Sequence, residues 1–148
     1  MKLLILNGPN LNLLGQREPD IYGHSTYADL CGMIADYVKE RGHQARFVQS
    51  NHEGALIDAI QLADADGTDG IVINPGAYAH YSYAIHDTLR SIRVPAVEVH
   101  ISDISRREAF RRTSVTAPAC RGQIVGHGFR GYLEAMELLE NIHKGDMK

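Results

Sequence analysis

The chain has 148 residues, a length that fits one domain with one core, because chains usually divide only above roughly 250 residues. With 44% hydrophobic and 22% charged residues the composition is globular, and the net charge of -3 argues against a protein that binds nucleic acid or an anionic membrane. No apolar run approaches the roughly 20 residues that span a bilayer, and the apolar start is shorter than a signal peptide, so we expect a soluble cytoplasmic protein.

The first predicted elements are a strand and a helix joined by a long loop. Residues 2–7 form a continuous apolar run, which is typical of a strand buried on both faces. A loop over residues 8–25 follows, after which Thr26 and Asp29 predict the N-cap and capping box of a helix. Gly42 suits the left-handed residue that ends this helix.

The rest of the chain continues to alternate between short apolar runs and helical patterns. Strands are predicted at residues 45–49, 70–74, 95–100 and 123–126. Helices are predicted around residues 56–63, 84–92 and 129–144, and Ser105 with Glu108 predicts the cap of a further short helix. This alternation indicates an α/β fold: a doubly wound five-stranded parallel sheet in the flavodoxin-like order 2-1-3-4-5, with helices on both faces.

Ligands of such sheets bind beyond the carboxyl ends of the strands, where the strand order reverses. This rule selects the loops after the first, third and fourth strands. Many of their polar residues also have an ordinary interpretation, and Asn74 before Pro-Gly could simply shape a turn. His100 stands out because it shares a strand face with Glu98. Arg107 and Arg111, four residues apart, would share one side of a short helix and suit an anion.

Several other functions of such chains lack their motifs. A flavin carrier would have a hydroxyl-rich phosphate loop, but residues 8–15 contain no Ser or Thr. A response-regulator receiver needs Asp after the third strand and Lys after the fifth, where this chain has Asn74 and Gly126. The G-x-G-x-x-G motif of a dinucleotide-binding dehydrogenase is absent. A metal site is not indicated either, because Cys31 and Cys120 lack metal-type spacing and the eight His form no zinc motif. An enzyme acting on a small polar substrate remains, with a ligand-binding module as the alternative.

Six motifs together resemble one family, the type II 3-dehydroquinate dehydratases. In chain order they are LNGPNLNLLG at 6–15, REP at 17–19 with Tyr22-Gly23, QSNHEG at 49–54, INPGAY at 73–78 with His80, EVHIS at 98–102 and FR at 110–111. They occur in the order of the family and extend over almost the whole chain, so their combination is much more specific than any one motif.

The resemblance implies a flavodoxin-like lyase that needs no metal and no organic cofactor. It would be a single catalytic domain over residues 1–148 that dehydrates 3-dehydroquinate to 3-dehydroshikimate through an enolate, without a Schiff base. The reaction would serve the shikimate pathway or quinate breakdown. The resemblance further implies a homo-oligomer, a dodecamer of trimers, whose other partner is the small-molecule substrate and not a nucleic acid or a membrane.

Roles for individual residues also follow from the resemblance. Tyr22, as tyrosinate, would remove the proton next to the substrate ketone, and Arg17 would stabilise that tyrosinate. Asn10 would hold a water that stabilises the enolate, while His100, supported by Glu98, would protonate the departing hydroxyl. Substrate-binding residues would be Asn74, Gly76, His80, Ile101, Ser102 and Arg111, together with Asp87, which would reach into the site of a neighbouring subunit.

Some positions depart from the family pattern, and others have no role in it. Asp103 stands where Asn is usual, and Ala79 and Tyr81 flank His80 where Thr is usual. No role is implied for three further residues: Tyr83, His86 and His127. These departures concern local packing and subunit contacts more than the reaction.

Two further features of the sequence, the loop over residues 11–23 and the small number of lysines, bear on the expected mechanism. This loop has the length and the glycines of a lid that would close over bound substrate. Only four of the 15 basic residues are Lys. Lys39 is expected on the exposed side of its helix, and the others lie near the termini. No lysine is therefore expected at the strand ends, where an imine with a carbonyl substrate would form.

Overall fold

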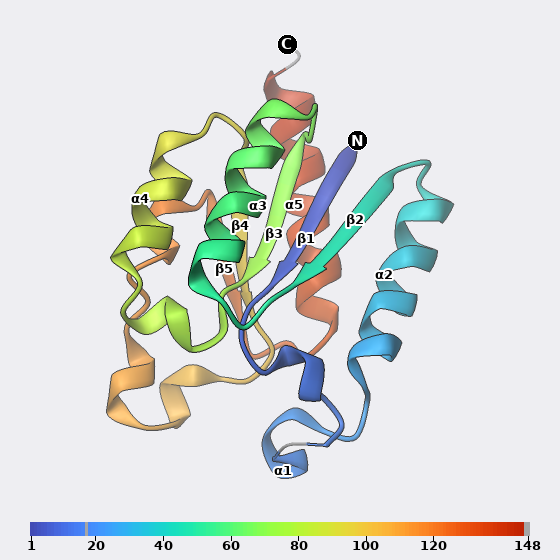
Figure 1. Ribbon diagram of the computed structural model, residues 1–148. Coiled ribbons are helices and arrows are strands. Elements are labelled where there is room, and N and C mark those ends of the chain that lie inside the picture. The colour runs from blue at the N-terminus through green and yellow to red at the C-terminus, as the bar shows by residue number, and fades with distance from the viewer. Residues whose placement is uncertain (17, 147–148) are drawn as a thin grey trace.

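The computed structural model describes residues 1–16 and 18–146, and five of its segments form one parallel sheet (Figure 1). The strands are β1 (Lys2–Asn7), β2 (Gln44–Gln49), β3 (Gly70–Asn74), β4 (Ala96–His100) and β5 (Gly122–Val125). Their order is β2-β1-β3-β4-β5, which confirms the predicted flavodoxin-like topology. The register pairs Asn7 with Asn74 and His100 with Val125, so the carboxyl ends of these strands meet at one edge of the sheet.

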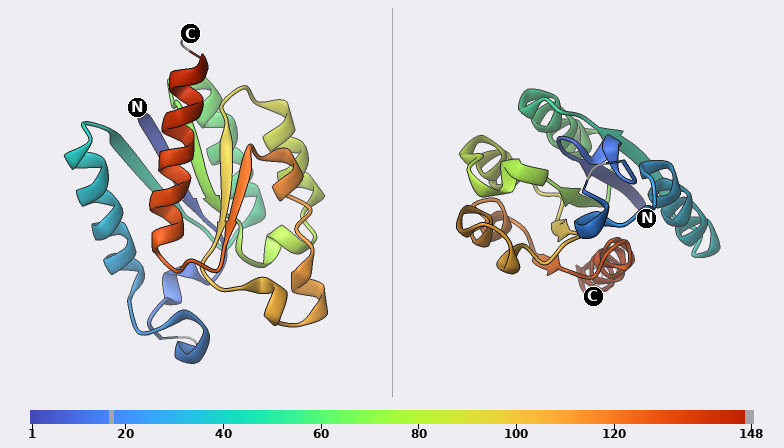
Figure 2. Two further views of the ribbon diagram at one scale, coloured as in Figure 1. Left: turned by 180° about the vertical axis from the view of Figure 1, so that it is seen from behind. Right: turned by 90° about the horizontal axis from the view of Figure 1, so that it is seen from below.

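Helices cover both faces of the sheet, as predicted (Figure 2). On one face lie α2 (Tyr27–Glu40) and α5 (Arg130–Asp146), and on the other α3 (Glu53–Ala65) and α4 (Tyr83–Ser91). Side chains of the central strands alternate between the two cores, because successive residues of a strand point to opposite faces. In β1, Leu3 and Ile5 pack with α2 and α5, whereas Leu4 and Leu6 pack with α3 and α4. This double burial explains the continuous apolar runs of the central strands.

The long connection after β1 contains more structure than the sequence predicted. Leu11–Leu13 form a 3₁₀ turn and Pro19–Tyr22 form the short helix α1, both beyond the carboxyl edge of the sheet. Leu11 and Leu14 are buried in the core that α2 and α5 cover, which holds the start of this connection against the sheet. The predicted capping box at Thr26 is confirmed, since its amide donates to Asp29 and its hydroxyl accepts from the Asp29 amide.

The predicted short helix with its cap at Ser105 and Glu108 is wrong. Two separate 3₁₀ turns occupy this region, Ile104–Arg106 and Ala109–Arg112. Asp103 caps the first by accepting from the Ser105 amide, because its short carboxylate reaches an amide two residues ahead. The Glu108 carboxylate instead accepts from the Arg111 guanidinium at 2.7 Å, so it does not act as a cap.

No helix within the described residues has the length and apolar character needed to cross a membrane.

Candidate active site

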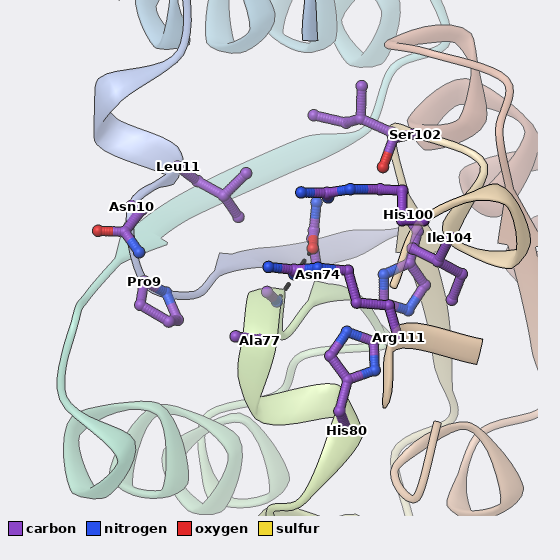
Figure 3. Close-up of a pocket in the computed structure, with 13 residues that line it drawn as sticks. Pro9, Asn10, Leu11, Asn74, Ala77, His80, His100, Ser102, Ile104 and Arg111 are labelled. Carbon is purple, nitrogen blue, oxygen red and sulfur yellow. Dashed lines mark hydrogen bonds between the residues drawn. The ribbon is translucent and has the colours of Figure 1, made fainter. Parts of the chain in front are cut away.

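A pocket lies beyond the carboxyl ends of β1, β3 and β4, where the strand order reverses (Figure 3). Pro9, Asn10 and Leu11 line one side, and residues at or beyond the ends of β3 and β4 line the other. These are Asn74, Gly76, Ala77, His80, His100, Ile101, Ser102, Ile104, Arg107 and Arg111. Segments that are far apart in the sequence therefore meet at the predicted edge of the sheet.

The structure brings most of the predicted site residues together. Those that line the pocket are Asn10, Asn74, Gly76, His80, His100, Ile101, Ser102 and Arg111. Glu98 lies behind His100 and not at the pocket surface. Asp87 is exposed on α4 and is not among the lining residues. Arg17 lies outside the described residues, as does the side chain of Tyr22, whose backbone belongs to α1.

His100 and Glu98 form a buried hydrogen-bonded pair at the end of β4. The exposed fractions of the two residues are 5% and 0%, and His100 Nε2 donates to Glu98 Oε2 at 2.9 Å. This bond leaves Nδ1 as the ring nitrogen available to exchange a proton. Burial by itself raises the pKa of Glu98. The hydrogen bond and charge of His100, together with hydrogen bonds from Thr116 and Ser114, outweigh the effect of burial and hold this pKa below its usual range. Glu98 is thus a carboxylate able to balance an imidazolium.

His80 lies beside this pair with a fixed tautomer. Its ring stacks on that of His100 with centroids 6.3 Å apart (Figure 3). The Nδ1 atom donates to the carbonyl oxygen of Thr113 at 2.8 Å, since a carbonyl can only accept. This leaves Nε2, which bonds to none of the described residues, as the ring atom that could accept from a hydroxyl group of a ligand.

The amide of Asn74 is oriented by a buried chain of hydrogen bonds. Its Oδ1 accepts from the Gly76 amide at 3.1 Å, and its Nδ2 donates to the Tyr132 hydroxyl at 3.0 Å. That hydroxyl in turn donates to Asn7 Oδ1 at 2.6 Å. Burial raises the pKa of Tyr132, so its hydroxyl remains protonated and able to donate. The second hydrogen of Asn74 Nδ2 is left for the pocket.

Two arginines supply positive charge. Arg111 lies over the Phe110 ring with its guanidinium carbon 4.8 Å from the centroid, and it donates to Glu108 at 2.7 Å. Arg107 is 3.7 Å from the carboxylate of Glu18, which precedes α1. The prediction that Arg107 and Arg111 share one side of a short helix is wrong. Arg107 directly follows the 3₁₀ turn Ile104–Arg106, whereas Arg111 lies in the next turn, Ala109–Arg112, yet both line the pocket. Their spacing was the signal that suggested an anion site.

Residues that support Glu98 were missed in the sequence. Ser114, Thr116 and Gln123 all donate to its carboxylate, but they follow β4 by many residues and belong to no recognised motif. Tyr132 was predicted only as a core residue of its helix. Within the described part of the chain, no group of three or more His, Cys, Asp or Glu is placed to hold a metal ion.

These groups suit acid–base chemistry on a small anion. The imidazole of His100 can pass a proton through Nδ1 while Glu98 balances its charge, and guanidinium groups bind carboxylates in bidentate fashion. At the switch point of a flavodoxin-like sheet, this combination defines an enzyme that moves protons on a small, negatively charged substrate.

Comparisons with known proteins identify the family. The family model for class II dehydroquinases matches residues 1–140. Proteins named 3-dehydroquinate dehydratase are similar to the chain: one from Thermotoga neapolitana is 53% identical over 148 residues, 100% of each chain. Another, from Clostridium acetobutylicum, is 55% identical over 142 residues, 96% of this chain and 98% of the relative. The crystal structure of type II dehydroquinase from Butyrivibrio crossotus has a TM-score of 0.94 and 56% identity, covering 95% of this chain and 97% of that one. The chain belongs to the class II dehydroquinase family, which confirms the resemblance seen in its motifs.

Proposed function

We propose that this chain is a hydro-lyase that converts 3-dehydroquinate to 3-dehydroshikimate by trans elimination of water. The names of its relatives support this substrate. The observation that carries the proposal is the buried pair of Glu98 and His100, of which His100 lines the pocket together with Arg111. A proton donor then lies in the same pocket as a group that binds carboxylates, as the elimination of water from a carboxylated ketone requires.

The first step would be removal of a proton next to the ketone by the tyrosinate form of Tyr22. Ionising a tyrosine of ordinary pKa near 10 at pH 7 costs about 4 kcal/mol. A cation within about 4–6 Å can lower such a pKa by about 1–3 units, and Arg17, five residues earlier in the chain, is the proposed source. Arg17→Ala should therefore lower kcat more than it weakens substrate binding. Full kcat in this variant at neutral pH would contradict the assignment.

The enolate formed in this step would be stabilised through a water held by Asn10. His100 would then protonate the departing hydroxyl, using the Nδ1 atom that Glu98 leaves available. No imine would form, and among the described residues no lysine lines the pocket. Treatment with borohydride in the presence of substrate should accordingly leave activity intact, and inactivation would contradict this mechanism.

The substrate would be held by polar groups on several sides. The Arg111 guanidinium would meet its carboxylate, and Asn74 and His80 would bind its hydroxyl groups through the donor and the acceptor identified above. Further contacts would come from Gly76, Ile101 and Ser102, which also line the pocket.

We further propose that the site is completed by a neighbouring subunit in a dodecamer built from trimers. Asp87, exposed on α4, would reach into the site of that neighbour. Asp87→Ala should then raise KM without lowering the free energy of unfolding. An unchanged KM would count against this role.

Biosynthesis along the shikimate pathway and quinate breakdown use the same reaction, and a cytoplasmic single-domain enzyme acting without metal or organic cofactor would serve either.

One assay separates the enzyme from a ligand-binding module. The purified protein is mixed with 3-dehydroquinate, and the ultraviolet absorbance of the conjugated enone product is followed over time. The parent protein should produce a steady rise in absorbance. Tyr22→Phe and His100→Ala should each slow this rise by at least about 100-fold. Binding of the substrate without any rise in absorbance would overturn the proposed function and favour the module.

A further inference from the structure

A short stretch of chain between the pocket and α4, residues 113–116, is held on one side by two histidines. His80 Nδ1 and His86 Nδ1 donate to the carbonyl oxygens of Thr113 and Val115, at 2.8 and 2.7 Å. The Val115 amide donates to the Ala79 carbonyl at 2.7 Å. Three hydrogen bonds therefore fix this stretch, and they give His86 a structural role that the sequence left open.

The side chains of Ser114 and Thr116 use the opposite side of this stretch to reach Glu98. Ser114 Oγ donates to Glu98 Oε2 at 2.7 Å, and Thr116 Oγ1 donates to Oε1. Gln123 Nε2 and His100 Nε2 also donate to Oε2, each at 2.9 Å. Each hydroxyl carries one hydrogen, so when both donate to the carboxylate, the 3.2 Å contact between Ser114 Oγ and Thr116 Oγ1 carries no hydrogen bond. A carboxyl group that accepts all four bonds must be ionised.

We propose that Ser114 and Thr116 are positioning residues that keep Glu98 ionised, so that a second proton on the Glu98–His100 pair yields an imidazolium. Without these donors the proton between Nε2 and Oε2 would pass toward the carboxylate, leaving a neutral imidazole. The Nδ1 proton of a neutral imidazole is a far weaker acid than that of an imidazolium. The catalytic consequence rests on the proposed function, whereas the protonation of the pair can be measured without substrate.

The direction of the effect follows from charge. The pair carries a net charge of -1 before the additional proton binds and none afterwards, and hydroxyl donors stabilise the negative form more. Removing a donor should therefore move the titration of the pair to higher pH. A merely structural role for the hydroxyl would leave this titration unchanged.

Other titratable groups near the pair remain the same in such a variant. His80 stacks on His100, while Arg107 and Arg111 line the pocket in front of it. Cys120 lies near Glu98, and burial, with the charge of Glu98, raises the pKa of its thiol to about 12, so it stays neutral. His86 lies across residues 113–116, where its Nδ1 is bound to a carbonyl. A shift caused by loss of one donor can therefore be assigned to that donor.

Thr116→Val is the cleanest test, because valine fills nearly the same volume at this buried position. The Thr116 hydroxyl also makes no helix-cap hydrogen bond, whereas Ser114 Oγ additionally accepts from the Ala117 amide. The imidazole of His100 is titrated by NMR in protein labelled with ¹⁵N-histidine, and His100→Asn assigns its signal. The midpoint should rise by about 0.5–1 pH unit, and kcat at pH 7 should fall about tenfold.

Matched variants make the result specific. Thr116→Ser retains the hydroxyl and should keep the parental titration. Thr88→Val removes a buried hydroxyl that bonds to the Ala84 carbonyl in α4, and it should not shift His100. If Thr116→Val does not fold, Gln123→Met removes another donor to Glu98 at an exposed position and should shift the midpoint in the same direction.

A midpoint that is unchanged or lower in a folded Thr116→Val or Gln123→Met protein would overturn the proposal. Failure of the parent protein to convert 3-dehydroquinate would overturn the proposed function instead, and it would leave the NMR titration interpretable.

Discussion

Tyr132→Phe removes a single oxygen atom from the buried hydrogen-bond chain beneath the pocket. The Tyr132 side chain is fully buried in α5, and its hydroxyl links Asn7 Oδ1 at 2.6 Å to Asn74 Nδ2 at 3.0 Å. Both asparagines are themselves buried. Asn7 Nδ2 already has no hydrogen-bond partner among the described residues, so loss of the hydroxyl would leave both polar atoms of this buried side-chain amide unpaired.

The expected loss is about 2–4 kcal/mol in the free energy of unfolding. The substitution leaves two buried side-chain atoms without this partner, Asn7 Oδ1 and Asn74 Nδ2. Each unpaired atom costs about 1–3 kcal/mol. Partial relaxation keeps the sum below the maximum. The phenylalanine ring fills the same space, so no cavity contributes to this cost.

Urea unfolding followed by circular dichroism measures the loss, with parent and variant at equal protein concentration because assembly would add to apparent stability. Tyr37→Phe is the matched control. Its hydroxyl donates to Glu137 at 3.2 Å in an exposed position, so its removal should cost at most about 0.5 kcal/mol. KM should rise in Tyr132→Phe, because the Asn74 amide loses a partner that orients it. A loss below about 1 kcal/mol, or one equal to that of Tyr37→Phe, would refute this reasoning.

Three further predictions concern charge and backbone packing. Arg111→Ala should raise KM about 10–100-fold, whereas Arg112→Ala, outside the pocket, should change it less than about twofold in steady-state assays. Because the pKa of Glu98 is lowered in the folded protein, its ionised form stabilises the fold above about pH 4.3, and this contribution is lost as the pH falls further. The difference in unfolding free energy between the parent protein and Glu98→Gln, measured by urea titration, should therefore shrink below that pH. A Cβ at Gly8 would lie 2.4 Å from the Pro75 carbonyl oxygen, so Gly8→Ala should lower the free energy of unfolding by at least about 2 kcal/mol. Gly32 lies in α2 with open space around it, so Gly32→Ala should raise the free energy of unfolding by about 0.5–1 kcal/mol, as measured by thermal unfolding.

The sequence was most informative where burial on both faces dictates residue type. The bounds of β1 and β3 were predicted to the residue, because the buried positions of these two strands carry apolar residues up to the asparagine that ends each strand. β2 and β5 lie at the sheet edges, are partly exposed, and each begins one residue before the predicted start. The short helix α1 was missed because four residues carry no periodic pattern. Pro19 in its first turn favours the helix, because its fixed φ angle suits that position.

For the candidate site, the sequence located what strand topology forces together. Asn74 and His100 end their strands, so a parallel sheet places both at one edge. Ser114 and Thr116 had no such signal, since serine and threonine in a loop usually face solvent or shape turns. Only the path of residues 113–116 beside Glu98 gives them a function, and that path is fixed by distant hydrogen bonds from His80 and His86.

The charges around His100 explain why Glu98 must be both buried and ionised. Arg107 and Arg111 line the same pocket, and their guanidinium groups disfavour a further positive charge on the imidazole. A carboxylate 2.9 Å from Nε2 opposes them at short range, and burial keeps that interaction unscreened by water. Binding of a substrate carboxylate to Arg111 would cancel one of the opposing charges. Substrate binding would in this way favour the protonated form of the imidazole that is proposed to act on the bound molecule. The donors on Glu98 would keep the other proton of that imidazolium on Nε2, so that the Nδ1 proton remains acidic.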